Sequence, residues 1–216
     1  MPKIVDHEER RRHLGGAACV VLGRTGSAGM TVRAVANEAG MALATAQHYL
    51  PTREHMVRAA IDHLADRVVR RARQIPAESI TVEVIGQAVR QLVPLDEERT
   101  FEARVWLALT AESLVDDQIA VVLAESEVEL RANLERLLAL GQASGDIGAQ
   151  VDARAEAAAL TTLMDGLTLR ILTTGLSHVD ACQEIDAHLV RLAPEQGRPI
   201  GQDRLRQPLG DVTPVD

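Results

Sequence analysis

The chain has 216 residues, 46% of them hydrophobic, which is enough to bury a core in one domain or in a small domain joined to a larger one. Its formal net charge of −8 argues against a nucleic-acid partner unless the charge is unevenly distributed. Residues 1–74 hold 12 Lys and Arg against 7 Asp and Glu, or +5, whereas residues 75–216 hold 11 against 24, or −13. This asymmetry is typical of a modular DNA-binding protein, because phosphate attraction acts locally, although a solvated basic face would show it too.

The composition favours helices. Alanine and leucine dominate, and the single Tyr, Phe and Trp stand at positions 49, 101 and 106. Sheets usually contain more aromatic residues, and the β-branched residues here are scattered rather than alternating. We therefore expect an all-α fold.

The N-terminus and the two cysteines bear on location and on metal binding. The segment from Lys3 to Arg12 is charged and lacks the apolar stretch of a secretory signal peptide. No apolar run reaches the roughly 20 residues that are needed to span a bilayer. A cytoplasmic protein with no membrane partner is expected. Cys19 and Cys182 fit no metal-binding spacing, so both are expected to be reduced and buried.

The first predicted helix covers residues 8–23. An apolar stripe at helical spacing supports it: Leu14, Ala17, Ala18, Val21 and Leu22. Three glycines within residues 23–29 then favour a loop. Thr31 is suited to cap a short second helix that runs through Ala39, and Gly40 suits the left-handed turn that follows.

A third helix is predicted at residues 42–50, where Pro51 stops it. Thr52 is suited to cap a fourth helix that continues to about Gln74. Four arginines lie in its last turns, where cations complement the helix dipole: Arg67, Arg70, Arg71 and Arg73. Further helices are predicted at residues 79–92, 97–115, 117–141, 152–174 and 179–192, or about nine in all, before a flexible tail at residues 194–216.

The second and third helices around Gly40, packed on the first, form a helix-turn-helix, in which the later short helix enters the major groove. Residues 14–56 resemble the TetR family of transcriptional regulators. The resemblance rests on the spacing of Leu14, Ala17, Ala18, Val21, Leu22 and Gly26, and on the segment from Thr31 to Met41. From the recognition helix to the start of the next helix, Thr45, Tyr49 and Glu54 fit the family, whereas Gln47 and Leu50 replace its usual tyrosine and phenylalanine.

The resemblance implies a DNA-binding domain at residues 1–55. Phosphate contacts are expected from four residues: Thr31, Thr45, Tyr49 and Arg53. Gln47 and His48 are expected to reach base edges, and Arg33 is expected to contact either a base or the backbone. For each residue the alternative is an exposed helix position without a ligand.

The resemblance further implies a helical ligand-binding and dimerisation domain at residues 56–193. The dimer interface is expected from the last two helices: Leu160, Leu163, Leu167, Ile171, Ile185, Leu189 and Leu192. Packing within one subunit is the alternative. The ligand pocket is predicted around Trp106, whose indole suits an apolar or cationic guest, together with Leu64, Ala103, Leu107, Thr110, Met164, Asp165 and Thr168. The alternative for Trp106 is a position in the core. The alternatives for Asp165 are a position on the surface or an ion pair with Arg170.

The sequence therefore predicts a ligand-responsive regulator, most readily a repressor that binds double-stranded operator DNA as a homodimer and is released by a small-molecule effector. The motifs of serine hydrolases, P-loop nucleotide-binding proteins, dinucleotide-binding proteins and zinc peptidases are absent from the sequence. We expect no catalytic residues, no cofactor and no metal. A helical protein-interaction module that has lost DNA binding is the alternative, with an enzyme as a weaker one.

Overall fold

The computed structural model describes residues 7–194, which form nine α-helices and two short 3-10 helices, with no strand among them. The all-α prediction is confirmed. Nearly all of the tail predicted at residues 194–216 lies outside the described residues. The helices are α1 (His7–Thr25), α2 (Val32–Glu38), α3 (Leu43–Tyr49), α4 (Arg53–Ala72), α5 (Val82–Arg90), α6 (Glu97–Ser113), α7 (Asp117–Ser144), α8 (Ala153–Thr174) and α9 (His178–Leu189), with η1 (Ser27–Gly29) and η2 (Val190–Leu192).

Short polar side chains begin most of these helices. The Thr31 and Thr52 side chains accept hydrogen bonds from the backbone N–H groups of Ala34 and His55, which confirms both predicted caps. Aspartates do the same for α6, α7 and α8 at Asp96, Asp116 and Asp152. Because capping depends on local sequence, it explains why the predicted helix starts agree closely with the structure.

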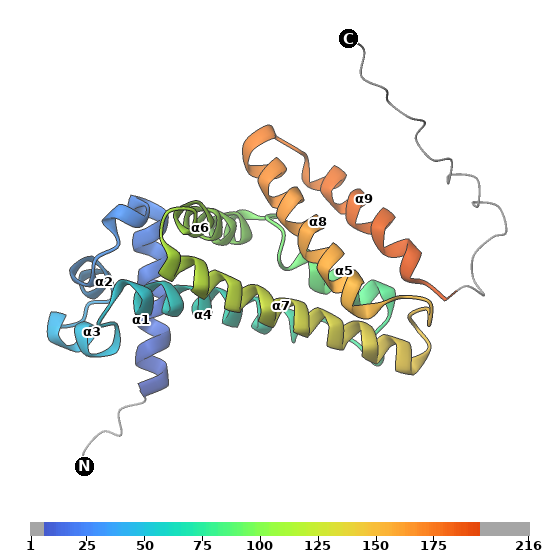
Figure 1. Cartoon of the computed structure of the whole chain (residues 1–216), viewed down its shortest axis with the longest axis horizontal. Coiled ribbons are helices and arrows are strands. Elements are labelled where there is room, and N and C mark those ends of the chain that lie inside the picture. The colour runs from blue at the N-terminus through green and yellow to red at the C-terminus, as the bar shows by residue number, and fades with distance from the viewer. Residues whose placement is uncertain (1–6, 195–216) are drawn as a thin grey trace, which may run out of the picture.

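The first three helices form a head at one end of the molecule (Figure 1). The close contact between α1 and α4 depends on Gly15, where a Cβ atom would lie 2.3 Å from the backbone oxygen of Ala59. Cys19 is buried at the same contact, as predicted, whereas Cys182 on α9 is only half-buried.

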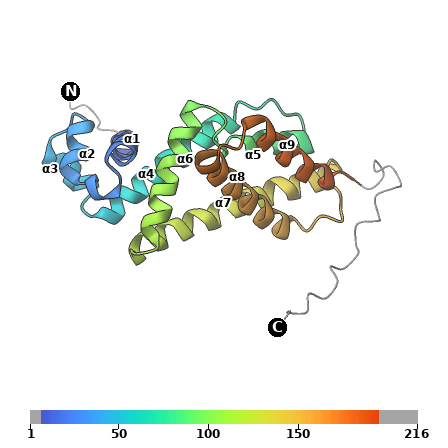
Figure 2. The same cartoon turned by 90° about the horizontal axis from the view of Figure 1, so that it is seen from above.

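Two hydrophobic clusters hold the chain together. The N-terminal core joins the head to α4, α6 and the start of α7, and includes Leu22, Val57, Leu109 and Ile119. The C-terminal core joins α5, α7, α8 and α9 at the far end of the molecule (Figures 1 and 2). The predicted boundary after residue 55 falls inside α4, so the N-terminal core spans it. Helix α4 therefore shares one core with the head, with α6 and with the start of α7.

Helix α7 is the longest of the described helices, with 28 residues, and it extends from the head side to the C-terminal core (Figure 1). No helix within residues 7–194 combines the length and apolar character that crossing a membrane requires.

Candidate nucleic-acid interface

The turn between α2 and α3 is built as the sequence predicts. Val35 and Ala36 bury one side of α2 in the N-terminal core. Gly40 then adopts a φ of +61°, in the left-handed region that glycine tolerates best. The Met41 N–H donates to the Ala36 carbonyl at 2.9 Å and closes the turn. This geometry fixes the position of α3 relative to α2.

Helix α3 is anchored on one side and open on the other. Ala46 and Leu50 are 0% and 2% exposed and hold the helix in the N-terminal core. Gln47 and His48 are exposed, whereas Thr45 and Tyr49 are half-buried. At 3.6 residues per turn, anchoring at positions 46 and 50 leaves Gln47 and His48 to face outward. Gln47 and His48 are thus free to meet a ligand.

An open hollow of about 440 Å³ lies between the start of α1 and α3, lined by His7, Arg10, Ala44, Thr45, His48 and Tyr49. The Tyr49 hydroxyl lies 2.7 Å from Nδ1 of His7, which comes from 42 residues earlier in the chain. The His48 ring meets Tyr49 edge-on, with 5.2 Å between ring centroids. Three predicted residues, Thr45, His48 and Tyr49, therefore come together.

Sequence reasoning missed His7 and Arg10 as members of this hollow. A signal was present, because Arg10 begins a run of three arginines on the first helix. These arginines contribute to the net charge of +5 over residues 1–74, but charge counting does not place any one of them at a site. Their position beside α3 depends on the packing of α1 against the rest of the head.

The other predicted DNA contacts lie apart from this hollow. Thr31 and Arg33 are exposed at the start of α2. Arg53 is half-buried, donates to the Ser27 carbonyl at 2.8 Å and is ion-paired with Glu112 of α6. Its side chain thus has two protein partners, and a phosphate would compete with them.

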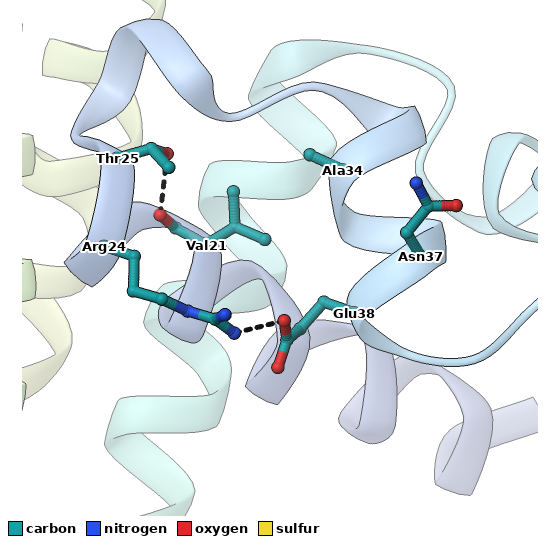
Figure 3. A pocket seen from close by; sticks show the side chains of 6 residues that line it. All are labelled: Val21, Arg24, Thr25, Ala34, Asn37 and Glu38. Carbon is teal, nitrogen blue, oxygen red and sulfur yellow. Dashed lines mark hydrogen bonds and ion pairs between the residues drawn. The ribbon is translucent and has the colours of Figure 1, made fainter.

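A second hollow, of about 290 Å³, separates the end of α1 from α2 (Figure 3). Its one arginine, Arg24, is ion-paired with Glu38 across the gap. The Thr25 hydroxyl donates to the Val21 carbonyl at 2.8 Å. With its charges balanced inside the site, this hollow offers an anion little attraction.

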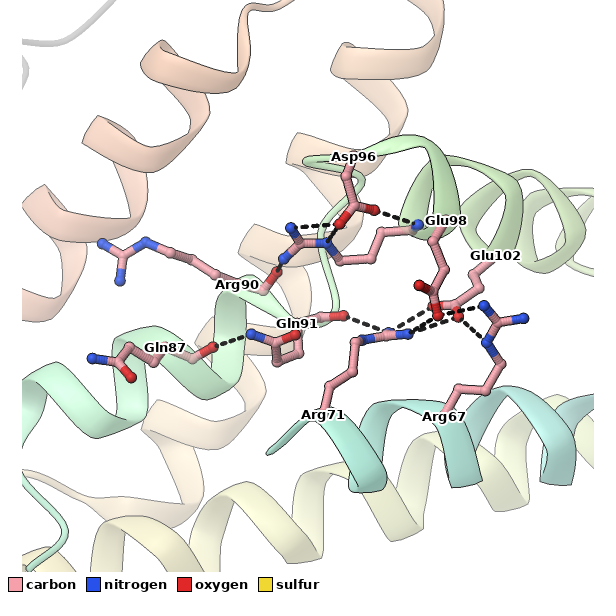
Figure 4. A network of polar contacts seen from close by, with 9 residues as sticks. Arg67, Arg71, Gln87, Arg90, Gln91, Asp96, Glu98 and Glu102 are labelled. Carbon is pink, nitrogen blue, oxygen red and sulfur yellow. Dashed lines mark hydrogen bonds and ion pairs between the residues drawn. The ribbon is translucent and has the colours of Figure 1, made fainter. Parts of the chain in front are cut away.

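A network of arginines and glutamates connects α4 to α6 (Figure 4). The Arg67 and Arg71 side chains both bind Glu102, with N–O distances of 2.7 Å, and both also bind Glu98. Arg71 further donates to the Gln91 carbonyl after α5 at 3.1 Å. Arg67 and Arg71 thus have direct carboxylate partners on α6, besides their favourable position near the C-terminal end of α4.

The charges of this network stabilise one another. Hydrogen bonding to Glu102 raises the pKa of Arg71, and hydrogen bonding to Arg67 lowers the pKa of Glu98. The Glu102 carboxylate is 9% exposed, so removing its arginines would leave a buried charge without partners. Together with Arg53 and Glu112, the network attaches α4 to α6 at both ends.

The residues predicted to bind a ligand do not share one environment. Leu64 lies in the N-terminal core, and half-buried Trp106 packs against that core. Met164, by contrast, lies in the C-terminal core. Ala103 and Thr168 are buried, Leu107 is half-buried, and Thr110 is exposed, with its hydroxyl donating to the Trp106 carbonyl at 3.0 Å.

Asp165 is exposed on α8, one residue and so about 100° around the helix from buried Met164. Partial desolvation and then the Glu127 carboxylate of α7 raise its pKa, and Arg131 opposes them. The interior that holds Met164 therefore excludes Asp165, which takes the surface position that the sequence left open.

Five of the seven residues predicted at a dimer interface are buried within one subunit. Their exposure is 3% or less: Leu160, Leu167, Ile185, Leu189 and Leu192. Leu163 and Ile171 are half-buried against the same C-terminal core. Since α8 packs between α7 and α9, its apolar stripe is covered by its own chain. In this structure those five side chains thus take the alternative that the sequence left open, which is packing within one subunit.

Known proteins resemble this chain along most of its length. Residues 81–194 match the family described as the C-terminal part of BetI-type transcriptional repressors. The HTH-type transcriptional regulator PksA of Bacillus subtilis (strain 168) is 29% identical over 173 residues, which cover 80% of this chain and 83% of PksA.

Two solved structures share the fold. A regulator from Rhodococcus sp. assigned to the TetR family has a TM-score of 0.79 at 21% identity, covering 86% of this chain and 99% of that one. A transcriptional regulator from Saccharomonospora viridis in complex with choline has a TM-score of 0.66 at 22% identity, covering 87% and 98%. The predicted resemblance is confirmed: this chain belongs to the TetR family and is a helix-turn-helix, DNA-binding regulator of transcription.

Proposed function

We propose that the protein is a repressor whose homodimer places its two α3 helices in successive major grooves of double-stranded operator DNA. The observation that carries this proposal is the anchoring of α3 by Ala46 and Leu50, which leaves Gln47 and His48 exposed side by side. Both side chains have hydrogen-bonding groups that can read base edges. Thr45 and Tyr49 in the adjoining hollow then supply phosphate contacts, as Thr31 and Arg33 do at the start of α2.

A small-molecule effector acts, in this proposal, through the junction of α6 with α4. Trp106 packs against the N-terminal core, which also contains Leu64 of α4. A guest beside the indole would displace α6 and, through the two arginine–glutamate connections, α4 as well. The effector must bind the DNA-incompetent state more tightly, because equal affinity for both states shifts nothing. The choline complex of the Saccharomonospora viridis regulator supports a compact cation as a first candidate, since an indole attracts cations.

The homodimer is proposed to form through the sides of α8 and α9 that face away from the C-terminal core. Large apolar side chains are exposed on these helices and on η2, which directly follows α9: Leu169, Val179 and Val190 are 50%, 67% and 67% exposed. A Cβ atom at Gly166 would meet no atom within 4 Å, so the α8 backbone is open to a close neighbour on that side. Apolar exposure next to an open glycine suits the approach of a second copy's helices.

Fluorescence anisotropy with labelled DNA from the gene's own upstream region tests this function. We expect salt-sensitive binding that Tyr49→Phe weakens to a similar degree on every sequence, because a phosphate contact carries no base preference. Adding the effector should release the DNA. If the protein binds no DNA even at low salt, the repressor proposal fails and a protein-interaction module becomes the better interpretation.

A further inference from the structure

The hollow between α1 and α3 holds an arginine that the predicted DNA contacts do not include. Arg10 lines it together with the hydroxyl-bearing side chains of Thr45 and Tyr49 and with the rings of His7 and His48. No carboxylate is among the six lining residues. Within residues 7–194 no ion pair involves Arg10, whereas Arg24 in the second hollow is paired with Glu38. Among the described residues, the α1–α3 hollow therefore presents a guanidinium that has no ion-pair partner.

We propose that Arg10 of α1 binds a phosphate of the DNA backbone in this hollow, beside the Tyr49 hydroxyl. A guanidinium offers several N–H donors in a plane that matches two phosphate oxygens at once. Thr45 adds a further hydroxyl from α3. The inference rests on the proposed role of α3 as the recognition helix, and it extends the DNA-contacting surface from the helix-turn-helix to the start of α1.

DNA is a better occupant of this hollow than a small free anion for two reasons. The hollow is open to the outside, so it cannot enclose a small molecule, whereas a duplex brings its own chain of phosphates along the surface. It also adjoins His48, which is exposed on the helix proposed to lie in the major groove. A phosphate on the strand that borders this groove would meet Arg10 when α3 is docked.

His7 acts in this proposal as a positioning residue for Tyr49. The 2.7 Å contact joins the Tyr49 hydroxyl oxygen to Nδ1 of His7, and the two ring centroids are 5.8 Å apart. When Nδ1 carries a proton it donates to the tyrosine oxygen, which leaves the tyrosine O–H free to donate to the phosphate. His7→Asn keeps a donor near that position, whereas His7→Leu removes it.

The test compares the full chain with Arg10→Ala and with Arg12→Ala, titrated against a labelled DNA duplex between about 50 and 200 mM salt. Arg12 is a matched control, because it lies on the same helix but is paired with Asp66 of α4 at 3.6 Å. We expect Arg10→Ala to weaken binding at least about tenfold on specific and scrambled DNA alike, and to reduce the salt slope by about 2 for a dimer with one lost contact per subunit. Arg12→Ala should change affinity less than about twofold, as a surface pair contributes little.

The role of His7 in positioning Tyr49 is tested by the DNA affinity of further variants. His7→Leu should weaken binding in the wild-type background but not in the Tyr49→Phe background, and His7→Asn should restore most of the affinity. Equal losses from His7→Leu in both backgrounds would overturn this role. Circular dichroism melting of each variant checks that the fold is kept.

Several results would overturn the phosphate site while leaving the proposed function intact. One is normal DNA binding by Arg10→Ala; another is an equal loss from Arg10→Ala and Arg12→Ala, which would indicate net charge alone. A loss confined to one DNA sequence would indicate a base contact. Calorimetric titration with inorganic phosphate completes the set: if Arg10→Ala abolished phosphate binding but not DNA binding, the site would be one for a free anion. Failure of the wild-type chain to bind any DNA would overturn the proposed function together with this site.

Discussion

The guanidinium of Arg53, at the first residue of α4, is ion-paired with the carboxylate of Glu112 near the end of α6. The pair spans 59 residues of sequence and joins the start of α4 to the end of α6. Oε2 of Glu112 is buried and has no hydrogen-bond partner within the described part of the chain. Arg53, which the sequence predicts to bind a phosphate, is therefore held by a glutamate of α6.

Glu112→Gln is expected to tighten DNA binding. The change removes the negative charge that competes with phosphate for Arg53, and a pair that is partly exposed contributes up to about 1 kcal/mol, or about fivefold in affinity. Fluorescence anisotropy at constant salt measures the effect. Glu125→Gln is the matched control, because Glu125 pairs with Arg58 on the α7 side of α4 at 2.7 Å. Unchanged or weaker binding by Glu112→Gln would show that Arg53 is not withheld from DNA by this pair.

Gly15→Ala is expected to lower the free energy of unfolding by at least about 2 kcal/mol, because its Cβ would lie 2.3 Å from the Ala59 carbonyl oxygen and force α1 away from α4. Gly16→Ala is the neighbouring control. Its Cβ would lie 3.0 Å from the outer edge of the His63 ring, which a small side-chain movement relieves. Urea unfolding of both variants distinguishes them, and similar stabilities for the two would contradict the close contact at Gly15.

His63 makes the α1–α4 contact sensitive to acid. Burial and then the charge of Arg67 lower its pKa, and Nδ1 is buried without a hydrogen-bond partner among the described residues. A lowered pKa in the folded state means that the folded protein prefers the neutral ring. The contribution of the neutral His63 ring to folding stability is therefore complete above the unfolded-state pKa of about 6.5. It is lost as the pH falls from there through the folded-state pKa.

The variant His63→Gln isolates this effect. Between about pH 7.5 and 5.5 the wild-type protein should lose more stability than the variant, by less than about 1 kcal/mol because the ring is half-buried and partly screened. Chemical unfolding at a series of pH values provides the comparison. If stability changed with pH in the same way for the two proteins, His63 would have the same pKa in the folded and unfolded states.

Cys19 is expected to be unreactive in the folded protein. Burial raises the pKa of its thiol to about 12, and its Sγ lies 3.4 Å from the Ala60 carbonyl. In a Cys182→Ser variant, a thiol reagent at about pH 8 should label Cys19 only as fast as the head opens, and urea should accelerate labelling. Rapid labelling of the native variant would contradict the burial of Cys19.

The local parts of this structure could be predicted from the sequence. Thr31 and Gly40 define the ends of α2, and Thr52 defines the start of α4, through interactions with residues a few positions away. Periodicity and capping are therefore sufficient to predict them.

The long-range parts could not be predicted. An apolar stripe shows that one face of a helix is buried, but not whether its own subunit or a second one covers it. For that reason the sequence alone leaves the surroundings of Leu160 and Ile185 open, whereas the structure buries both within one subunit. Likewise, the residues near Arg53 in the sequence do not indicate its ion pair with Glu112, and those near Tyr49 do not indicate its contact with His7. These contacts depend on how α1 and α6 pack against the rest of the chain.

The central claim, that a dimer reads DNA with two α3 helices, is tested most directly by selecting DNA from a random pool with the full-length protein and sequencing what it retains. The account predicts an enriched inverted repeat whose half-sites lie about one helical turn, roughly 10 base pairs, or a multiple of it apart. Gln47→Ala and His48→Ala should change the preferred bases within each half-site. No enrichment over a protein-free control, or an enriched sequence that neither variant alters, would contradict it.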